Sequence, residues 1–143
     1  MTITVDTSVL IELLLDQDRA EESESLLDAI AEGRIDAVVS HFAVHAIEAM
    51  LPTQRELSAF LKDVETSKGL TVHETTISEE QSVSILSGKI GLDFDDSVQY
   101  YVAKQTSSSA IVSFDKHFDG CGIPRREPIQ ILKELNKEPR HDD

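Results

Sequence analysis

The chain has 143 residues, of which 40% are hydrophobic, and this is enough for one domain with a buried core. Its formal net charge of −14 disfavours non-specific binding to nucleic acid, and its single cysteine excludes a disulfide framework and a cysteine-based zinc site. No stretch approaches the roughly 20 apolar residues that cross a bilayer, and the first residues lead into a strand pattern without the design of a signal peptide, so we expect a cytoplasmic protein.

Strand and helix patterns alternate along the chain. Short apolar or β-branched runs predict strands at 3–6, 35–40, 70–74 and 110–113, and residues 120–123 could add a short edge strand. Apolar spacing and capping residues predict helices at 9–15 (capped by Ser8), 19–31, 41–51, 54–67, 78–89, 97–104 and from 128 onward. Such alternation predicts an α/β fold of three layers, α/β/α, with a four- to five-stranded, mostly parallel sheet. We assign residues 1–136 to this single domain and residues 137–143 to a frayed acidic tail.

Acidic residues are expected to meet at the carboxyl edge of this sheet, where parallel α/β sheets bind ligands. They are Asp6, Glu48, Asp96 (with Asp93 and Asp95 beside it) and Asp115. Glu48 lies on a helix face that should be partly buried, and buried glutamates are rare unless they are paired or bind metal. Simpler roles exist for the others, because Asp6 and Asp115 can bond turn amides and Asp96 can cap its helix.

Carboxylates a few Å apart cannot all ionise without a cation, because each raises the pKa of its neighbours. Mg²⁺ and Mn²⁺ prefer carboxylate oxygens and water, which matches a site built from acids without cysteine. Such a site suits phosphate chemistry. One ion lowers the pKa of a bound water, and a second, roughly 3.5–4 Å away, can stabilise the leaving 3′-oxygen. The sequence therefore indicates a divalent-metal site for phosphodiester hydrolysis.

Four segments, taken together, resemble the PIN domain. Asp6 stands in Val-Asp-Thr-Ser-Val-Leu, seven residues separate Ser40 from Glu48, Asp96 opens Asp-Ser-Val-Gln-Tyr-Tyr-Val-Ala, and Asp115 stands in Ile-Val-Ser-Phe-Asp-Lys-His-Phe. No single motif is specific, but the four motifs in this order and with this spacing are. Together they cover nearly the whole chain. They look most like the small, single-domain VapC-type toxins of prokaryotic toxin–antitoxin pairs.

This resemblance implies an endoribonuclease that depends on Mg²⁺ or Mn²⁺, with an antitoxin protein as partner and a homodimeric assembly. The implied catalytic and metal-binding residues are Asp6, Glu48, Asp96 and Asp115. Asp96 is chosen over its neighbours because it directly precedes the pattern of 97–103, as the family's acid does, and Asp93 is the second choice. Ser8 and Ser113 occupy positions where the family often has a group that orients the acids.

Other functions fit the residues less well. His41, His45 and Glu48 share one helix face and could bind zinc, but His-Phe-Ala-Val-His lacks the internal glutamate of the metalloprotease motif. Ser8 stands where a metal-dependent phosphatase of the two-aspartate type needs its second aspartate. The alternatives that stay open are a non-toxin PIN-type RNA-processing nuclease and a catalytically silent PIN-fold binding module.

The small number of basic residues limits the RNA affinity that the nuclease hypothesis can expect. Basic residues near the predicted edge are few: Lys104, Lys116, Arg125 and Arg126, with His117 as a further candidate for a phosphate contact. Ribonucleases need contacts with the phosphates of RNA, so such a small set of basic residues predicts modest affinity for RNA or recognition of the RNA by its shape. The acidic excess, which includes the run at 21–24, suits a basic partner peptide.

Overall fold

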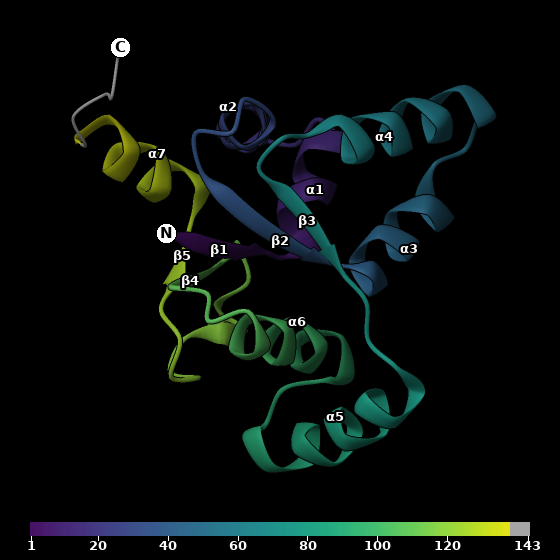
Figure 1. The fold of residues 1–143 in the computed structure, drawn as a ribbon, viewed down its shortest axis with the longest axis vertical. Helices are drawn as coiled ribbons and strands as arrows, with labels where there is room; N and C mark the ends of the chain where they lie inside the picture. Colours follow the sequence, from purple (N-terminus) through teal and green to yellow (C-terminus); the bar gives the residue numbers. More distant parts are fainter. Residues whose placement is uncertain (138–143) are drawn as a thin grey trace.

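The computed structural model describes residues 1–137 and contains one sheet of five parallel strands. The strand order is β3-β2-β1-β4-β5. The strands are β1 (Thr2–Val5), β2 (Asp36–Ser40), β3 (Leu70–His73), β4 (Ala110–Val112) and β5 (Arg125–Arg126). The predicted parallel sheet is therefore confirmed, with β1 at its centre (Figure 1).

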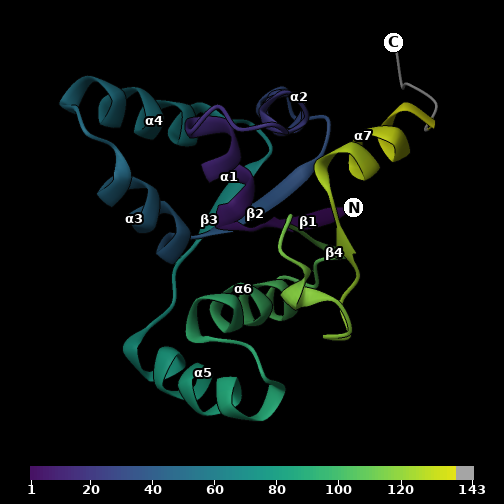
Figure 2. The same cartoon turned by 180° about the vertical axis from the view of Figure 1, so that it is seen from behind.

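Helices cover both faces of the sheet (Figures 1 and 2). They are α1 (Thr7–Leu14), α2 (Ala20–Ala31), α3 (His41–Met50), α4 (Gln54–Thr66), α5 (Ile77–Ile90), α6 (Phe94–Gln105) and α7 (Pro128–Lys137), with a short 3₁₀ helix η1 (Lys116–Phe118). Side chains from α1, α2 and α7 pack on one face of the sheet, and α6 packs on the other, with α5 outside it. The predicted three-layer architecture is thus confirmed.

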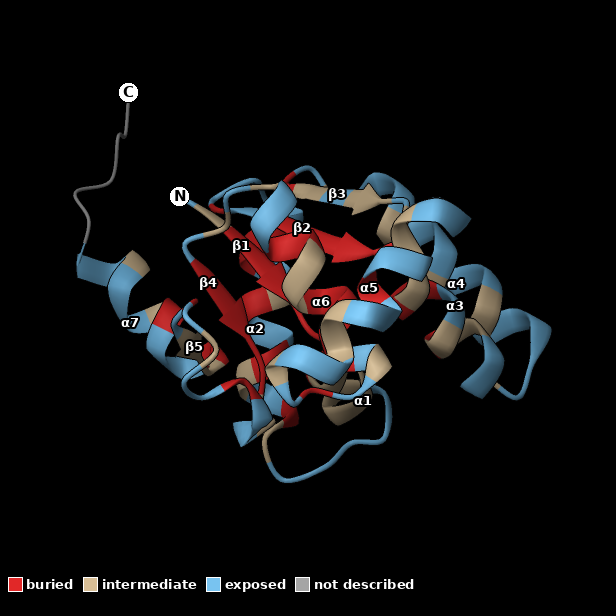
Figure 3. Cartoon of the chain, turned by 90° about the horizontal axis from the view of Figure 1, so that it is seen from below, coloured by how far each residue is buried: buried red, intermediate tan, exposed pale blue. Residues whose placement is uncertain are grey.

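The core follows from the alternation of side chains along the central strands. Ile3 and Val5 of β1 are buried against α1 and α2, whereas Ile111 of β4 is buried on the opposite face. Figure 3 shows that burial is greatest in β1, β2 and β4. Parallel strands covered on both faces are expected to be largely apolar, and most buried residues of these strands are, with Thr4 of β1 and Ser40 of β2 as buried polar exceptions.

Two predictions for the C-terminal part of the chain differ from the structure. The fifth strand is β5, not residues 120–123, because Gly120 and Gly122 have φ angles of +83° and +100° and turn the chain there. Lys137, assigned to the tail, ends α7, and residues 138–143 of the predicted tail lie outside the described residues. Within the described part of the chain, no helix has the length and apolar character that a membrane span requires.

Candidate metal centre

Two neighbouring strands deliver two of the predicted acids to one edge of the sheet. Val5 of β1 pairs with Val112 of β4, so the two strands end side by side. Asp6 follows directly, and its backbone N–H donates to the carbonyl of Val112 at 2.9 Å. Asp6 is the N-cap of α1, the position expected of Ser8, and Asp115 is the N-cap of η1. Both acids therefore also bond backbone amides of the following turn, which is the simpler role considered for them.

A single buried hydroxyl connects these two acids. Ser113 Oγ donates to Asp6 Oδ2 at 2.8 Å and accepts the backbone N–H of Asp115 at 2.9 Å. Ser8 Oγ lies 3.2 Å from Ser113 Oγ and accepts the backbone N–H of Phe114. Both serines therefore take part in the hydrogen bonds that hold the strand ends together.

Asp96 reaches the same edge from α6. This helix begins at Phe94, earlier than predicted, because the Asp93 side chain accepts the Asp96 backbone N–H at 2.9 Å and is the N-cap in place of Asp96. Asp96 consequently lies in the first turn, and it is only 8% exposed. We call Asp6, Asp96 and Asp115 the acidic cluster.

The carboxylates of the acidic cluster act on one another electrostatically. Burial, followed by the negative charges of Asp93, Asp115 and Asp6, raises the pKa of Asp96 to about 6. Burial also raises the pKa of Asp6, although Ser113 and Ser8 donate hydrogen bonds to it. A bound cation would remove this repulsion, so the acidic cluster has the donor set and the unmet charge of a divalent-metal site.

His117 is the one residue of this site whose contact with the acids the sequence analysis missed. Its Nδ1 lies 3.0 Å from Asp115 Oδ1 and 3.4 Å from Asp96 Oδ2. Within residues 1–137, Asp96, Asp115 and His117 form the one group of three or more potential metal ligands whose atoms all lie within 4.8 Å of one another. The only sequence signal was its spacing, two residues after Asp115 in a tight turn.

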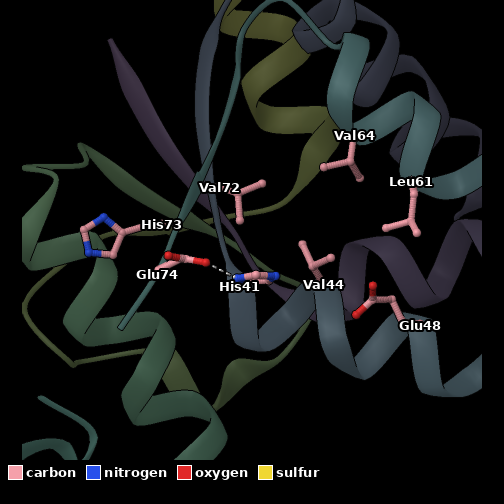
Figure 4. Close-up of a pocket in the computed structure, with 8 residues that line it drawn as sticks. All are labelled: His41, Val44, Glu48, Leu61, Val64, Val72, His73 and Glu74. Atoms are coloured by element: carbon pink, nitrogen blue, oxygen red, sulfur yellow. Dashed lines mark hydrogen bonds and ion pairs between the residues drawn. The ribbon is translucent and has the colours of Figure 1, made fainter. Parts of the chain in front are cut away.

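Glu48, the fourth predicted ligand, is not part of the close group that Asp96, Asp115 and His117 form among the described residues. Its Oε1 accepts a hydrogen bond from His45 Nδ1 at 2.5 Å, and its charge is not among those that raise the pKa of Asp96. It lines a pocket of about 500 Å³ between α3, α4 and β3 (Figure 4). The lining residues are His41, Val44, Glu48, Leu61, Val64, Val72, His73 and Glu74.

The zinc arrangement considered for α3 does not form among the described residues. The rings of His41 and His45 stack with centroids 4.1 Å apart, but each Nδ1 contacts a different carboxylate. His41 contacts Glu74 at 2.8 Å, and His45 contacts Glu48. The histidines and Glu48 therefore do not converge on one point, and Figure 4 shows His73 directed away from them.

Arg125, one of the few basic residues near this edge, is bound to groups of the protein itself. It is 13% exposed and donates to Asp119 at 2.7 Å, to Glu127 at 3.1 Å and to the carbonyl of Ser113 at 3.1 Å. Glu127 also pairs with Arg19. This network stabilises the strand end beside the acidic cluster, which is a structural role.

Replacing Ser113 with alanine should weaken metal binding, because its hydroxyl orients both Asp6 and Asp115. Loss of such a supporting hydrogen bond typically lowers metal affinity about 10- to 100-fold. Calorimetric titration with Mn²⁺ would measure the effect. Ser109→Ala, which removes an exposed hydroxyl at the other end of β4, is the matched control and should bind Mn²⁺ normally. Unchanged affinity of Ser113→Ala would mean that the hydroxyl only supports the turn.

Comparison with known proteins gives a family and a fold. The family model described as PIN domain matches residues 2–117. Among solved structures, VapC20 from Mycobacterium tuberculosis, described as a toxin that cleaves the sarcin–ricin loop, has 16% identity and a TM-score of 0.66, covering 85% of this chain and 95% of that one. PAE2754 from Pyrobaculum aerophilum has 17% identity and a TM-score of 0.62, covering 96% and 100%. FitAcB from Neisseria gonorrhoeae has 20% identity and a TM-score of 0.59, covering 89% and 98%. No curated protein matches.

Proposed function

Because this chain belongs to the PIN domain family, we propose that it is a divalent-metal-dependent endoribonuclease and the toxin of a toxin–antitoxin pair. The observation that carries the proposal is the convergence of Asp6, Asp96 and Asp115 at the ends of β1 and β4 and the start of α6. The similar fold of VapC20, described as a toxin that cleaves the sarcin–ricin loop, supports RNA as the substrate. The lone Cys121 is compatible with action in the reducing cytoplasm.

In this proposal the three acids hold Mg²⁺ or Mn²⁺, for which carboxylate oxygens are preferred ligands. When bound, such an ion supplies a water of lowered pKa and positive charge for the leaving oxygen. Ser113 keeps Asp6 and Asp115 in register through its two hydrogen bonds. Asp93 fixes the first turn of α6 and so fixes the backbone of Asp96.

The proposal is tested with protein purified free of any inhibitor and incubated with RNA. We expect cleavage with Mg²⁺ or Mn²⁺, none after chelation with EDTA, and recovery when the metal is returned. If neither metal supports cleavage of any RNA in a total cellular preparation, the protein is a catalytically silent binding module. Denaturing gel electrophoresis of the RNA gives the readout.

The sequence also predicts Glu48 as a fourth ligand, and Glu48→Gln tests whether it acts together with the three acids. Glu48 follows Ser40, the last residue of β2, by eight residues. Because an α-helix rises about 1.5 Å per residue, Glu48 lies about 12 Å along α3 from the end of β2. From this position and its contact with His45, we expect Glu48→Gln to reduce cleavage by less than about tenfold, equivalent to 1.4 kcal/mol. A loss as large as that of Asp115→Asn would instead identify Glu48 as a ligand.

We extend the proposal to two partners, an antitoxin and a second copy of the chain. The net charge of −14 suits an antitoxin that presents basic side chains to the acidic cluster. Expression of the chain alone should arrest cell growth, and co-expression of a small protein encoded beside it should restore growth. Growth that continues despite active enzyme would favour the non-toxin RNA-processing nuclease. Sedimentation analysis of the purified chain tests the dimer.

A further inference from the structure

His117 is held against the acidic cluster by its own backbone. Its N–H donates to Asp115 Oδ1 at 2.9 Å, and the next residue, Phe118, is fully buried. These two anchors fix the short helix η1, so the imidazole cannot leave the site without rotating about its side-chain bonds. Although the side chain is 70% exposed, its Nδ1 faces inward, toward Asp115 and Asp96.

The distances at Nδ1 are those of ligands that share one ion. Two adjacent ligand atoms around an octahedral ion at about 2.1 Å lie about 3 Å apart. The corresponding separation around a tetrahedral ion at about 2.05 Å is about 3.3 Å. His117 Nδ1 lies 3.0 Å from Asp115 Oδ1 and 3.4 Å from Asp96 Oδ2, so both coordination geometries fit and the chemistry of the donor atoms decides.

We propose that His117 Nδ1 is a nitrogen ligand of the metal centre and that the centre consequently prefers Mn²⁺ to Mg²⁺. This inference rests on the proposed metal-dependent function and names its ion. Mg²⁺ is a hard cation that binds oxygen almost exclusively, whereas divalent transition metals accept imidazole. One nitrogen among carboxylate oxygens therefore shifts the preference without creating a closed zinc site, for which the described residues offer too few nitrogen or sulfur ligands.

Pulsed electron paramagnetic resonance of bound Mn²⁺ tests the ligand directly, because a coordinated imidazole gives a ¹⁴N coupling. The wild type should show this coupling, and His117→Ala should lose it. By calorimetry, His117→Ala should bind Mn²⁺ at least about tenfold more weakly, since even a supporting residue is worth that much. Its Mg²⁺ affinity should stay within about twofold, because Mg²⁺ relies on oxygen ligands.

His41→Ala is the matched control, because His41 also places Nδ1 against a carboxylate, that of Glu74 at 2.8 Å, but on the α3 and β3 side. It should keep both the ¹⁴N coupling and the wild-type affinity. Mn²⁺ binding without ¹⁴N coupling, or unchanged or tighter Mn²⁺ binding by His117→Ala, would overturn this inference but not the proposed function. His117 would then be a hydrogen-bond partner of the acids only. If the wild type bound neither Mn²⁺ nor Mg²⁺, the proposed function would fail with it.

Discussion

Asp6→Asn and Asp115→Asn should each reduce RNA cleavage about a thousandfold or more, equivalent to about 4 kcal/mol of transition-state stabilisation. Asparagine preserves the size of the side chain, and its oxygen can still accept the Ser113 hydroxyl at position 6 or the His117 N–H at position 115. The substitution removes only the charge and one oxygen ligand. Initial cleavage rates at saturating Mn²⁺ measure the loss, and circular dichroism checks that the fold persists.

Asp36→Asn is the control for this experiment. Asp36 is an exposed acid at the start of β2, at the opposite edge of the same sheet from the acidic cluster. Its replacement changes the net charge by the same amount but touches no residue of the site, so cleavage should remain near the wild-type rate. Cleavage by Asp6→Asn at the rate of Asp36→Asn would mean that Asp6 is merely the cap of α1.

The placement of Asp6 and Asp115 could be predicted because it depends on local patterns and on one topological rule. Each follows a short apolar strand, and parallel strands bring their carboxyl ends to the same edge. The exact start of α6 was not predictable, because Asp93 and Asp96 are both good capping residues and only the observed hydrogen bond shows that Asp93 is the cap.

Tertiary contacts explain what the sequence did not reveal. The direction of α3, and with it the position of Glu48, depends on how Val44 and Ile47 pack in the core. Arg125 appeared to be a surface cation, but its partners include the carbonyl of Ser113, twelve residues away. Ser113 and Asp6 are 107 residues apart, so no local pattern could indicate that one hydroxyl connects two acids.

Without metal, the wild-type protein should lose stability as the pH rises from about 4 to about 6. The pKa of Asp96 is about 6 in the folded protein and 3.8 ordinarily, so between these values the folded state binds more protons than the unfolded state. Stability then falls with rising pH and levels off above about pH 6, which is the sign that linkage requires. The full difference corresponds to at most about 3 kcal/mol, and solvent screening reduces it to about 1–2 kcal/mol.

Asp96→Asn should therefore be more stable than the wild type at pH 8 in metal-free buffer, and Mn²⁺ should reverse the order. Mn²⁺ at one hundred times its Kd should stabilise the folded wild type by about 2.7 kcal/mol. Asp96→Asn lacks one of the carboxylates that would bind the ion, so it should lose most of this stabilisation. Urea unfolding with and without Mn²⁺ measures both effects. Asp119→Asn should have the opposite effect and lower the stability at pH 8. Arg125 lowers the pKa of Asp119, so the negative charge of Asp119 stabilises the folded state. A less stable Asp96→Asn at pH 8 would show that the contact with His117 outweighs the repulsion within the acidic cluster.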